Sequence, residues 1–567
     1  MKRMVVEMLL FVVSMAAETQ QRSVKVRLFW QHPPAHISVA PLGAALRMCE
    51  SCAPTRLNAL LEITAKGSSV TAGSRSSPVL YLTGQIHISG NGFSSFIVGD
   101  ELLIQAREDV LLLTLTMPLE EYVTAVLQGE SASFKSDEAL KAMAVAARTY
   151  AVRFGSRHRL EGFDFCDTTH CQDLRLGNES PRARVAAAAT ERELLWFEGS
   201  PAAAYYHRSC GGEIDDAKAL EPDLHVRYLQ RHHDDYCVRI PDEWQSEISK
   251  TDLARALGRS VTSVRVLARG DSGRVQRLLI NNRAITATDF RLAVGRTLGW
   301  DELRSDLYEE EDRGNSIQFR GRGQGHGVGL CQSGAESMGE QGHGYRDILA
   351  YYYPGTAVGI NAQGLSWEKL PGESLDLVST DRNDASVLLP AAERALHFAV
   401  ERTGLQMRTR PQLKVYSTIA IYRDATGEPG WVAASTLGST VRLQPISILQ
   451  RTHSLDSTLR HEFLHMLIES NAKSDTPLWF REGLVVYLAG DSSGKDKANM
   501  SGEAIDREIS SPKTQAEVRL AYRQAAALVR DLDRRYTRVR LIDWLRNGLP
   551  DDIRSSVAST GVHEVAK

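Results

Sequence analysis

The sequence predicts a mixed α+β protein built from several domains. Its 567 residues exceed what a single hydrophobic core normally organises. Between about residues 24 and 115, short apolar runs alternate with Gly, Ser and Pro turns, which is typical of strands. From Leu119 onward the apolar residues recur at helical spacing instead. A hydrophobic content of 43% with 24% charged residues fits ordinary globular domains.

We expect five segments along the chain. They are a signal peptide over 1–20, an α/β domain with mixed sheets over 21–365, a polar linker over 366–386, a domain with a small sheet and a helix bundle over 387–550, and a polar tail over 551–567. Lys2 and Arg3 precede an apolar run and two small residues, the layout of a secretory signal. A buried first strand or helix is the alternative. The signal predicts export to the periplasm or cell envelope.

The charge balance argues against a nucleic-acid partner. Lys and Arg number 67 against 70 Asp and Glu, which gives a formal net charge of -3 and no strong field of one sign.

Two helices are expected after the strands of the first domain. The first places Leu119, Tyr122 and Val126 on one face, and the second is an alanine-rich helix from Glu138 to about Phe154. A bend over 128–133 separates them. Glycine is dense over 321–344, which implies tight turns or close backbone approach. In the second domain we expect a helix near Pro390–Thr403, two or three strands over 412–449 and a final helical pair over about 515–547.

The motif His461-Glu-Phe-Leu-His465 predicts a metal site on a helix. Residues four apart face the same way, so both imidazoles can reach one ion, while Glu462 lies beside them as a candidate general base. A catalytic zinc commonly takes a third protein ligand, and Glu482 stands 17 residues after His465 on the next predicted helix. The alternative is a chance match on a core helix whose two histidines have ordinary partners.

The predicted helix that carries Glu482 resembles a known family. The run PLWFREGLVVY, Pro477 to Tyr487, resembles the gluzincin metallopeptidases, in particular the peptidase-MA-like group, over about 388–548. The resemblance implies one catalytic Zn2+ held by His461, His465 and Glu482, with Glu462 as the base. The peptide or protein substrate is not indicated.

The first domain resembles another family through longer motifs. MPLEEYVTAVLQGE, SFKSDEALKAMAVAARTYAVR and FRGRGQGHGVGLCQSGAESMGEQGHGYRDILAYYYPGT are similar to the stage II sporulation protein D (SpoIID) family, which includes the amidase enhancer LytB. The resemblance covers about 24–365. It implies a lytic transglycosylase, which cuts peptidoglycan glycan strands without water and leaves a 1,6-anhydro sugar end.

Carried over by this resemblance, Glu130 is the single catalytic acid and base. To be protonated at neutral pH it needs a pKa raised by apolar neighbours, for which Tyr122, Val126, Phe134 and Met143 are candidates. The alternative is a Glu that merely caps a helix. The family commonly has Met after this Glu, where this chain has Ser131, and Glu138 is expected to be structural.

The glycine-rich segment offers two candidate substrate-binding residues, His326 and Gln332. Both can donate hydrogen bonds to sugar hydroxyls. Glycine turns that only hold two sheets together explain the segment equally well.

Seven cysteines allow both metal and disulfide interpretations. Some members of the resembled family bind a structural zinc through a Cys/His cluster, which here would be His158, Cys166, His170 and Cys171. The alternative is a Cys166–Cys171 disulfide with Cys210–Cys237 as a second bridge, and the redox compartment decides between the two. Cys49 and Cys52 are predicted to form a small local bridge, which leaves Cys331 over.

Together these features predict an exported enzyme that remodels the cell wall. Its partners would be peptidoglycan glycan strands, a cell-wall amidase and an unidentified peptide or protein substrate. The alternative is a non-catalytic peptidoglycan-binding amidase enhancer joined to an inactive metallopeptidase-like scaffold.

Overall fold

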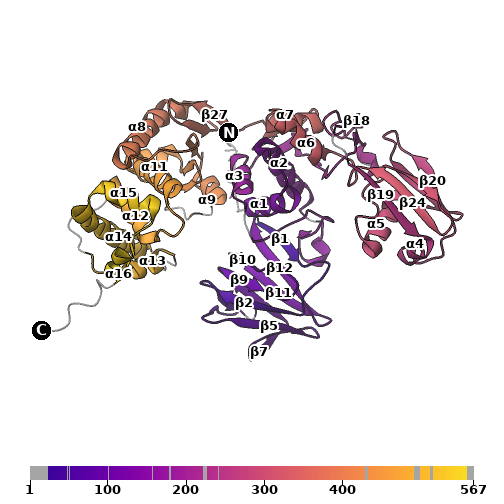
Figure 1. Ribbon diagram of the computed structural model, residues 1–567, viewed down its shortest axis with the longest axis horizontal. Coiled ribbons are helices and arrows are strands. Elements are labelled where there is room, and N and C mark those ends of the chain that lie inside the picture. Colours follow the sequence, from indigo (N-terminus) through magenta and orange to yellow (C-terminus); the bar gives the residue numbers. More distant parts are fainter. Residues whose placement is uncertain are drawn as a thin grey trace, which may run out of the picture.

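The computed structural model describes residues 23–558 except for 48, 50, 100, 156, 178–179, 221–225, 240–241, 427, 429–431, 491–497 and 511–514. The expected signal peptide lies outside the described residues. The chain builds a mixed α/β structure with several sheets and three hydrophobic cores, which confirms the predicted fold class at that level. In Figure 1, a central part is flanked by an inserted lobe on one side and the C-terminal helices on the other.

The central part begins with two sheets that share one core and are antiparallel, apart from one edge strand of the larger sheet, which runs parallel to its neighbour. A seven-stranded sheet runs in the order β13-β1-β12-β11-β8-β3-β4, and a six-stranded sheet in the order β10-β9-β2-β5-β6-β7. Inward and outward residues alternate in β6 and β8, as expected for strands with one buried face. The strands are β1 (Ser23–Leu28), β2 (His36–Pro41), β3 (Ala45–Arg47), β4 (Thr55–Arg56), β5 (Leu61–Lys66), β6 (Ser69–Ala72), β7 (Arg75–Ser77), β8 (Val79–Thr83), β9 (Ile86–Ser89), β10 (Phe96–Val98), β11 (Glu101–Arg107), β12 (Val110–Pro118) and β13 (Phe165–Cys166).

A layer of helices follows directly from β12. The alanine-rich α2 (Asp137–Phe154) is buried along most of its length and contacts α1 (Leu119–Glu130), α3 (Pro181–Ala189), α6 (Gln332–Glu340) and α7 (Tyr345–Tyr352). Small side chains on α2 let these neighbours approach closely. Short elements connect the layer: η1 (Arg159–Glu161), β14 (Leu194–Phe197), β15 (Ser200–Pro201), β16 (Tyr206–His207), β17 (Glu213–Ile214), η2 (Ala217–Ala219), β18 (His232–His233), β25 (Leu330–Cys331) and β26 (Ala357–Gly359).

The inserted lobe interrupts this part between β18 and β25 and has a core of its own. Two three-stranded sheets, β19-β24-β23 and β20-β21-β22, pack with two helices (Figure 1). Its elements are β19 (Glu243–Ser249), α4 (Lys250–Leu257), β20 (Val264–Arg269), β21 (Val275–Ile280), β22 (Arg283–Thr286), α5 (Ala287–Leu298), β23 (Tyr308–Asp312) and β24 (Ser316–Arg322).

The C-terminal part combines a five-stranded sheet, in the order β27-β28-β29-β31-β30, with a group of helices around one core. The strands are β27 (Glu368–Pro371), β28 (Asp376–Ser379), β29 (Gln412–Val415), β30 (Ala434–Leu437) and β31 (Thr440–Leu443). The helical elements are η3 (Arg382–Asp384), α8 (Ala385–Thr403), α9 (Ile419–Thr426), α10 (Ile446–Arg451), α11 (Leu455–Asn471), α12 (Leu478–Ala489), α13 (Gly502–Ser510), α14 (Gln515–Tyr536), α15 (Arg538–Asn547) and α16 (Asp551–Ala558).

Two segments that the sequence suggested to be a linker and a tail contain secondary structure. Residues 366–386 are not only a linker, because they form β27, β28 and η3. The polar appearance of β28 misleads because Asp376 is buried yet paired with Lys369 and Arg410. The tail predicted from 551 begins with α16, where the apolar Ile553 is buried against the domain core.

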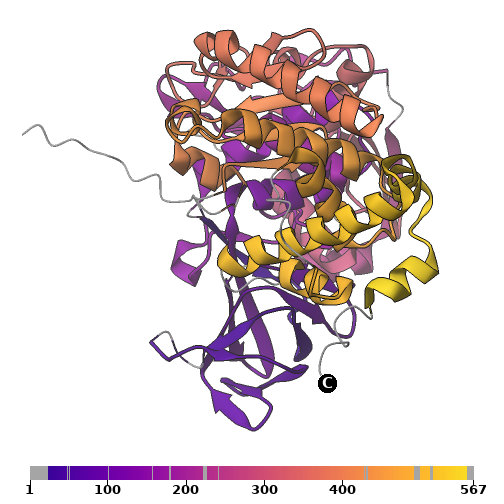
Figure 2. The same ribbon diagram turned by 90° about the vertical axis from the view of Figure 1, so that its left-hand side faces the viewer.

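A polar joint connects the central and C-terminal parts. Lys414 of β29 lies 3.5 Å from the Glu191 carboxylate, donates to the carbonyl of Ala188 at 2.7 Å and sits over the Trp367 ring. The Tyr416 hydroxyl donates to the same carboxylate at 2.6 Å. Figure 2, which looks from the C-terminal side, shows the orange and yellow helices in front of the central purple ones.

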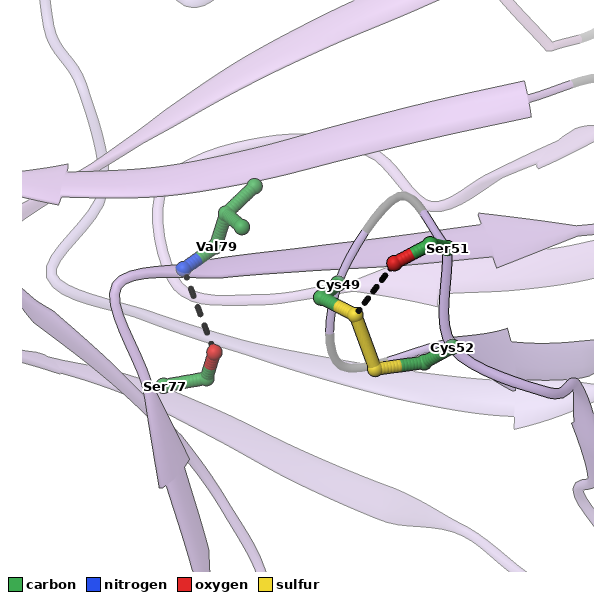
Figure 3. Close-up of a disulfide and its surroundings, with 5 residues drawn as sticks. All are labelled: Cys49, Ser51, Cys52, Ser77 and Val79. Carbon is green, nitrogen blue, oxygen red and sulfur yellow. Dashed lines mark hydrogen bonds between the residues drawn. A yellow bond between two sulfur atoms is a disulfide. The ribbon is translucent and has the colours of Figure 1, made fainter.

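The predicted local bridge between Cys49 and Cys52 is confirmed. The two sulfur atoms are bonded in the loop after β3, and the Ser51 hydroxyl lies 3.7 Å from Cys49 Sγ (Figure 3). Across the described ranges, no helix combines the length and the apolar character that crossing a bilayer requires.

Candidate functional site

Glu130 is the last residue of α1 and lies half-buried where three segments meet. Its Oε1 accepts a hydrogen bond from the backbone N–H of Asp173 at 2.8 Å, and its Oε2 accepts one from Gln332 Nε2 at 3.1 Å. The structure therefore brings together Glu130 and Gln332, two residues selected from the sequence, although they are 202 positions apart.

The surroundings of Glu130 favour its protonated form. Burial raises the pKa of its carboxyl group, while the hydrogen bonds from Asp173 N–H and Gln332 stabilise the ionised form and oppose that rise. The position at the C-terminal end of a helix acts with burial, because the exposed carbonyls carry partial negative charge. The four apolar neighbours expected from the sequence, Tyr122, Val126, Phe134 and Met143, are all buried.

A hydrogen-bond chain extends from this carboxyl environment into the core. Gln172 accepts from the Tyr122 hydroxyl at 2.9 Å and donates to the Tyr206 hydroxyl at 2.7 Å. Burial raises the pKa of the Tyr206 phenol, and the charge of Glu130 adds to that rise. Gly129 is required here because a Cβ at that position would lie 2.2 Å from the carbonyl oxygen of Asp173.

The bend after Glu130 is clamped from both sides. From α6, Glu336 accepts the backbone N–H of Lys135 at 2.6 Å and of Ser136 at 3.1 Å. From α3, Arg182 donates to the carbonyl of Phe134 at 2.8 Å. Glu138 bonds instead to Lys141 and to the N–H of Tyr345, in keeping with its expected structural position.

His326 lies in the glycine-rich segment beside His207, with ring centroids 5.3 Å apart. Its Nδ1 accepts the N–H of Val328 at 3.1 Å, and its ring also hydrogen-bonds the backbone of Tyr206. Burial and the neighbouring His207 lower the pKa of His326 well below its usual value, so the ring is neutral at neutral pH. Its role toward a sugar stays a prediction.

The four residues predicted to hold a structural zinc meet in one place. Ligand atoms of His158, Cys166, His170 and Cys171 all lie within 4.8 Å of one another. Both cysteines are free and their sulfur atoms are 3.3 Å apart. The second nitrogen of His158 lies 2.7 Å from the Glu161 carboxylate, the kind of support that orients a metal-binding imidazole. This donor set fits a tetrahedral zinc ion.

The HExxH residues occupy α11, and Glu482 faces them from α12. His465 Nε2 and Glu482 Oε2 are 3.0 Å apart, and the His461 and His465 ring centroids are 5.5 Å apart. Burial lowers the pKa of His465, but its hydrogen bond to Glu482 and the charge of that carboxylate raise it to about 9. Among the described residues, two groups of possible metal ligands have all their ligand atoms within 4.8 Å of one another. They are the His158 cluster and a second cluster around Cys210, whereas His461, His465 and Glu482 do not form such a group.

Glu462 is buried and points toward an edge strand. Its Oε2 accepts a hydrogen bond from the Thr436 hydroxyl of β30 at 2.8 Å. Tyr522 of α14 interacts electrostatically with both Glu482 and Glu462. Burial raises the pKa of the Tyr522 phenol, and the charges of these two carboxylates add to that rise. Sequence reasoning missed Thr436 and Tyr522, for which the motif spacing contains no signal.

Other contributors near Glu130 were also missed. Gln172 directly follows Cys171 of the predicted zinc cluster, but nothing in the sequence indicated its hydrogen bonds, and the backbone donor at Asp173 follows only from the folded loop.

Comparison with known proteins matches two family models within the chain. The model described as "Stage II sporulation protein" matches residues 108–197, which contain Glu130. A model described as "Domain of unknown function (DUF8618)" matches residues 239–329, which is the inserted lobe.

Several individual proteins are similar to part of the chain. An uncharacterized protein of Brachyspira hyodysenteriae is 31% identical over 267 residues, 45% of this chain and 71% of that protein. Stage II sporulation protein D of Bacillus subtilis is 27% identical over 269 residues, 43% of this chain and 74% of that protein. The amidase enhancer of Bacillus subtilis is 25% identical over 289 residues, 41% of this chain but 39% of that protein. Through its N-terminal half, the chain belongs to the SpoIID family of stage II sporulation proteins.

Proposed function

We propose that this protein is an exported cell-wall enzyme whose N-terminal part is a lytic transglycosylase acting on peptidoglycan glycan strands. The observation that carries the proposal is a half-buried carboxyl group with a raised pKa, held at a three-segment junction by two hydrogen-bond donors. Membership of a family whose relatives include a sporulation protein and an amidase enhancer supports a cell-wall role.

One carboxyl group is sufficient for the proposed reaction. Protonated Glu130 donates its proton to the glycosidic oxygen as the bond to the anomeric carbon breaks. The resulting carboxylate then accepts the proton of the sugar's own 6-hydroxyl as that oxygen bonds to the anomeric carbon. The sugar ends as a 1,6-anhydro ring, no water is consumed, and Glu130 returns to its starting form.

The first test is digestion of glycan strands freed of peptides, followed by mass spectrometry of the products. Wild-type protein is expected to give anhydro-ended fragments, and Glu130→Gln is expected to lower the rate by at least about 100-fold because it cannot donate the proton. Glu138→Gln is the matched control and should retain activity. Equal digestion by Glu130→Gln and wild type would remove Glu130 as the acid and favour a non-catalytic amidase enhancer.

For the C-terminal part we propose a zinc-dependent peptidase. His461, His465 and Glu482 would hold the ion, which supplies Lewis acidity and an activated water. Glu462, oriented by Thr436, would accept the proton, and the His465–Glu482 distance of 3.0 Å supports a shared ion. Among the strands that the structure describes, β30 is the last of its sheet and lies beside Glu462, which suits the pairing of an extended peptide with its outer edge.

Zinc analysis and a general protease assay test this second proposal together. His461→Ala should remove one zinc per chain, whereas Glu462→Gln should keep the zinc and lose proteolysis. A wild-type zinc content that His461→Ala leaves unchanged would end the peptidase proposal without touching the glycan-cutting one.

A further inference from the structure

A second group of thiols lies buried at the base of the inserted lobe. Cys210, Cys237 and Cys331 meet the carboxylate of Asp234, and each of the four residues is at most 1% exposed. Their ligand atoms all lie within 4.8 Å of one another, and all three cysteines are free. The cysteine that sequence analysis left over, Cys331, therefore has two thiol neighbours, and the alternative Cys210–Cys237 bridge is not formed.

The spacing of these atoms suits one tetrahedral ion. Zinc–sulfur bonds of about 2.3 Å place two ligand atoms about 3.7 Å apart on the edge of a tetrahedron. Cys210 Sγ and Asp234 Oδ2 are 3.3 Å apart. Three sulfurs and one carboxylate oxygen form a donor set that zinc accepts, whereas Mg2+ and Ca2+ require oxygen donors throughout.

Backbone N–H groups are aimed at the sulfur atoms. Gly212 N–H donates to Cys210 Sγ at 3.3 Å, while Cys331 Sγ accepts from the N–H of Cys210 at 3.3 Å and of Gly334 at 3.4 Å. Such donors stabilise thiolates, which are the metal-binding form of cysteine. Asp234 is fixed as well, because the N–H of Cys237 and the Tyr352 hydroxyl each donate to it at 3.0 Å.

A buried guanidinium supplies the opposite charge. Three thiolates and a carboxylate around a divalent cation leave two negative charges in the core. Arg274 of the inserted lobe is 2% exposed and donates to the carbonyl oxygen of Cys210 at 2.6 Å. Its Nε and Nη1 are buried without a hydrogen-bond partner among the described residues, and its charge interacts with Asp306 and Asp215 and, after them, with Cys210 of the cluster.

We propose that Cys210, Asp234, Cys237 and Cys331 bind a structural zinc ion, separate from the His158 cluster and from the HExxH residues. The ion ties together the two ends of the inserted lobe, since the matched segment 239–329 runs between Cys237 and Cys331. It also fixes the start of α6, where Gln332 donates to Glu130. This last consequence alone depends on the glycan-cutting proposal.

The test is metal analysis of the full-length protein purified under reducing conditions. Cys331→Ser should lower the zinc content by one ion per chain, His158→Ala by one, and the combination by two. Cys49→Ser with Cys52→Ser is the matched control and should lose none. Equal zinc in Cys331→Ser and wild type overturns the proposal, whatever the glycan assay shows.

A second measurement uses the wild-type chain, so it does not depend on a variant folding. Native protein is treated with iodoacetamide with and without a zinc chelator, and the alkylated cysteines are identified by mass spectrometry. We expect Cys210, Cys237 and Cys331 to be protected until the chelator is added. A Cys210–Cys237 disulfide in non-reduced peptides, or alkylation that the chelator does not change, contradicts the site.

Discussion

At the scale of single residues, the Glu130 carboxyl group is subject to opposing influences. Burial and the helix C-terminus favour its neutral form, whereas the Asp173 N–H and the Gln332 amide favour its ionised form. Burial is the largest of these influences, and the pKa of the carboxyl group is raised. A general acid in this balance loses activity as the pH rises through its raised pKa, because the proton it must donate is gone.

Gln332→Met tests this balance. Without the amide donor the ionised form of Glu130 is less stable, so its pKa rises further and the alkaline limb of the rate profile moves to higher pH. The measurement is kcat/KM for glycan cleavage against pH. Gln341→Met, on an exposed residue at the end of α6, is the control and should leave the profile in place. A limb that stays put or moves to lower pH contradicts the assignment of Glu130 as the acid.

Sequence alone selected Glu130 and Gln332 but not how they meet. Motifs identify residue types at short spacing, whereas Asp173 is 43 positions from Glu130 and contributes through its backbone. Any residue type other than Pro has that N–H, so no side-chain pattern can indicate it.

At the scale of elements, the distance between α12 and α14 controls where Glu482 points. A Cβ on Gly483 would lie 2.6 Å from the carbonyl oxygen of Ala525 and 2.7 Å from Val529 Cγ2. The glycine that follows Glu482 is thus required by helix packing, and it lets α12 approach closely enough to direct the carboxylate at His465.

Gly483→Ala should therefore separate the two helices. We expect a loss of about 1–3 kcal/mol in the free energy of unfolding and weaker zinc binding, measured by denaturant titration and by competition with a chelator. Val486→Ala on the same helix removes buried volume without forcing the helices apart, so it should destabilise the protein but leave zinc affinity unchanged. Unaltered zinc affinity in Gly483→Ala would show that this packing does not position Glu482.

Helices and strands were predicted well where apolar residues recur at regular spacing. They were predicted poorly where a segment has few apolar residues or where its buried residues are polar. The HExxH helix, the alanine-rich helix and the final helical pair follow from their patterns. β28 was missed because its buried Asp376 has cationic partners distant in sequence, and α16 because one buried Ile553 carries little periodic signal.

At the scale of the whole molecule, the two proposed activities are held in a fixed relation by the Glu191–Lys414 joint. Both side chains are buried at the contact between the central and C-terminal parts. A cavity of about 720 Å3 lies between the same parts, lined by Gln128 near Glu130 and by Leu437 near Thr436. Sequence could not predict this contact, because each partner is an ordinary charged residue in its own domain.

Lys414→Met should loosen the joint. Removal of one charge leaves the buried Glu191 without its counter-ion, which costs about 3–5 kcal/mol. We expect calorimetry to show a lower melting temperature and separate transitions for the two parts. Lys473→Met, at an exposed pair with Asp475 3.7 Å away, should change stability by less than about 1 kcal/mol. If Lys414→Met melts like wild type, the parts are joined by other contacts.

The inserted lobe has one further consequence. Its first strand pairs with its last, Glu243 opposite Arg322, so the chain leaves the central part and returns to it at neighbouring points. A segment whose two ends lie side by side can be inserted wherever the host protein has two neighbouring backbone positions, as in a hairpin turn. The lobe also has a core of its own, so we expect it to fold as a free-standing protein that can be assayed for ligands. Its excision, in contrast, would take from the central part the hydrogen bonds that Arg274 donates to the carbonyls of Cys210 and Glu213.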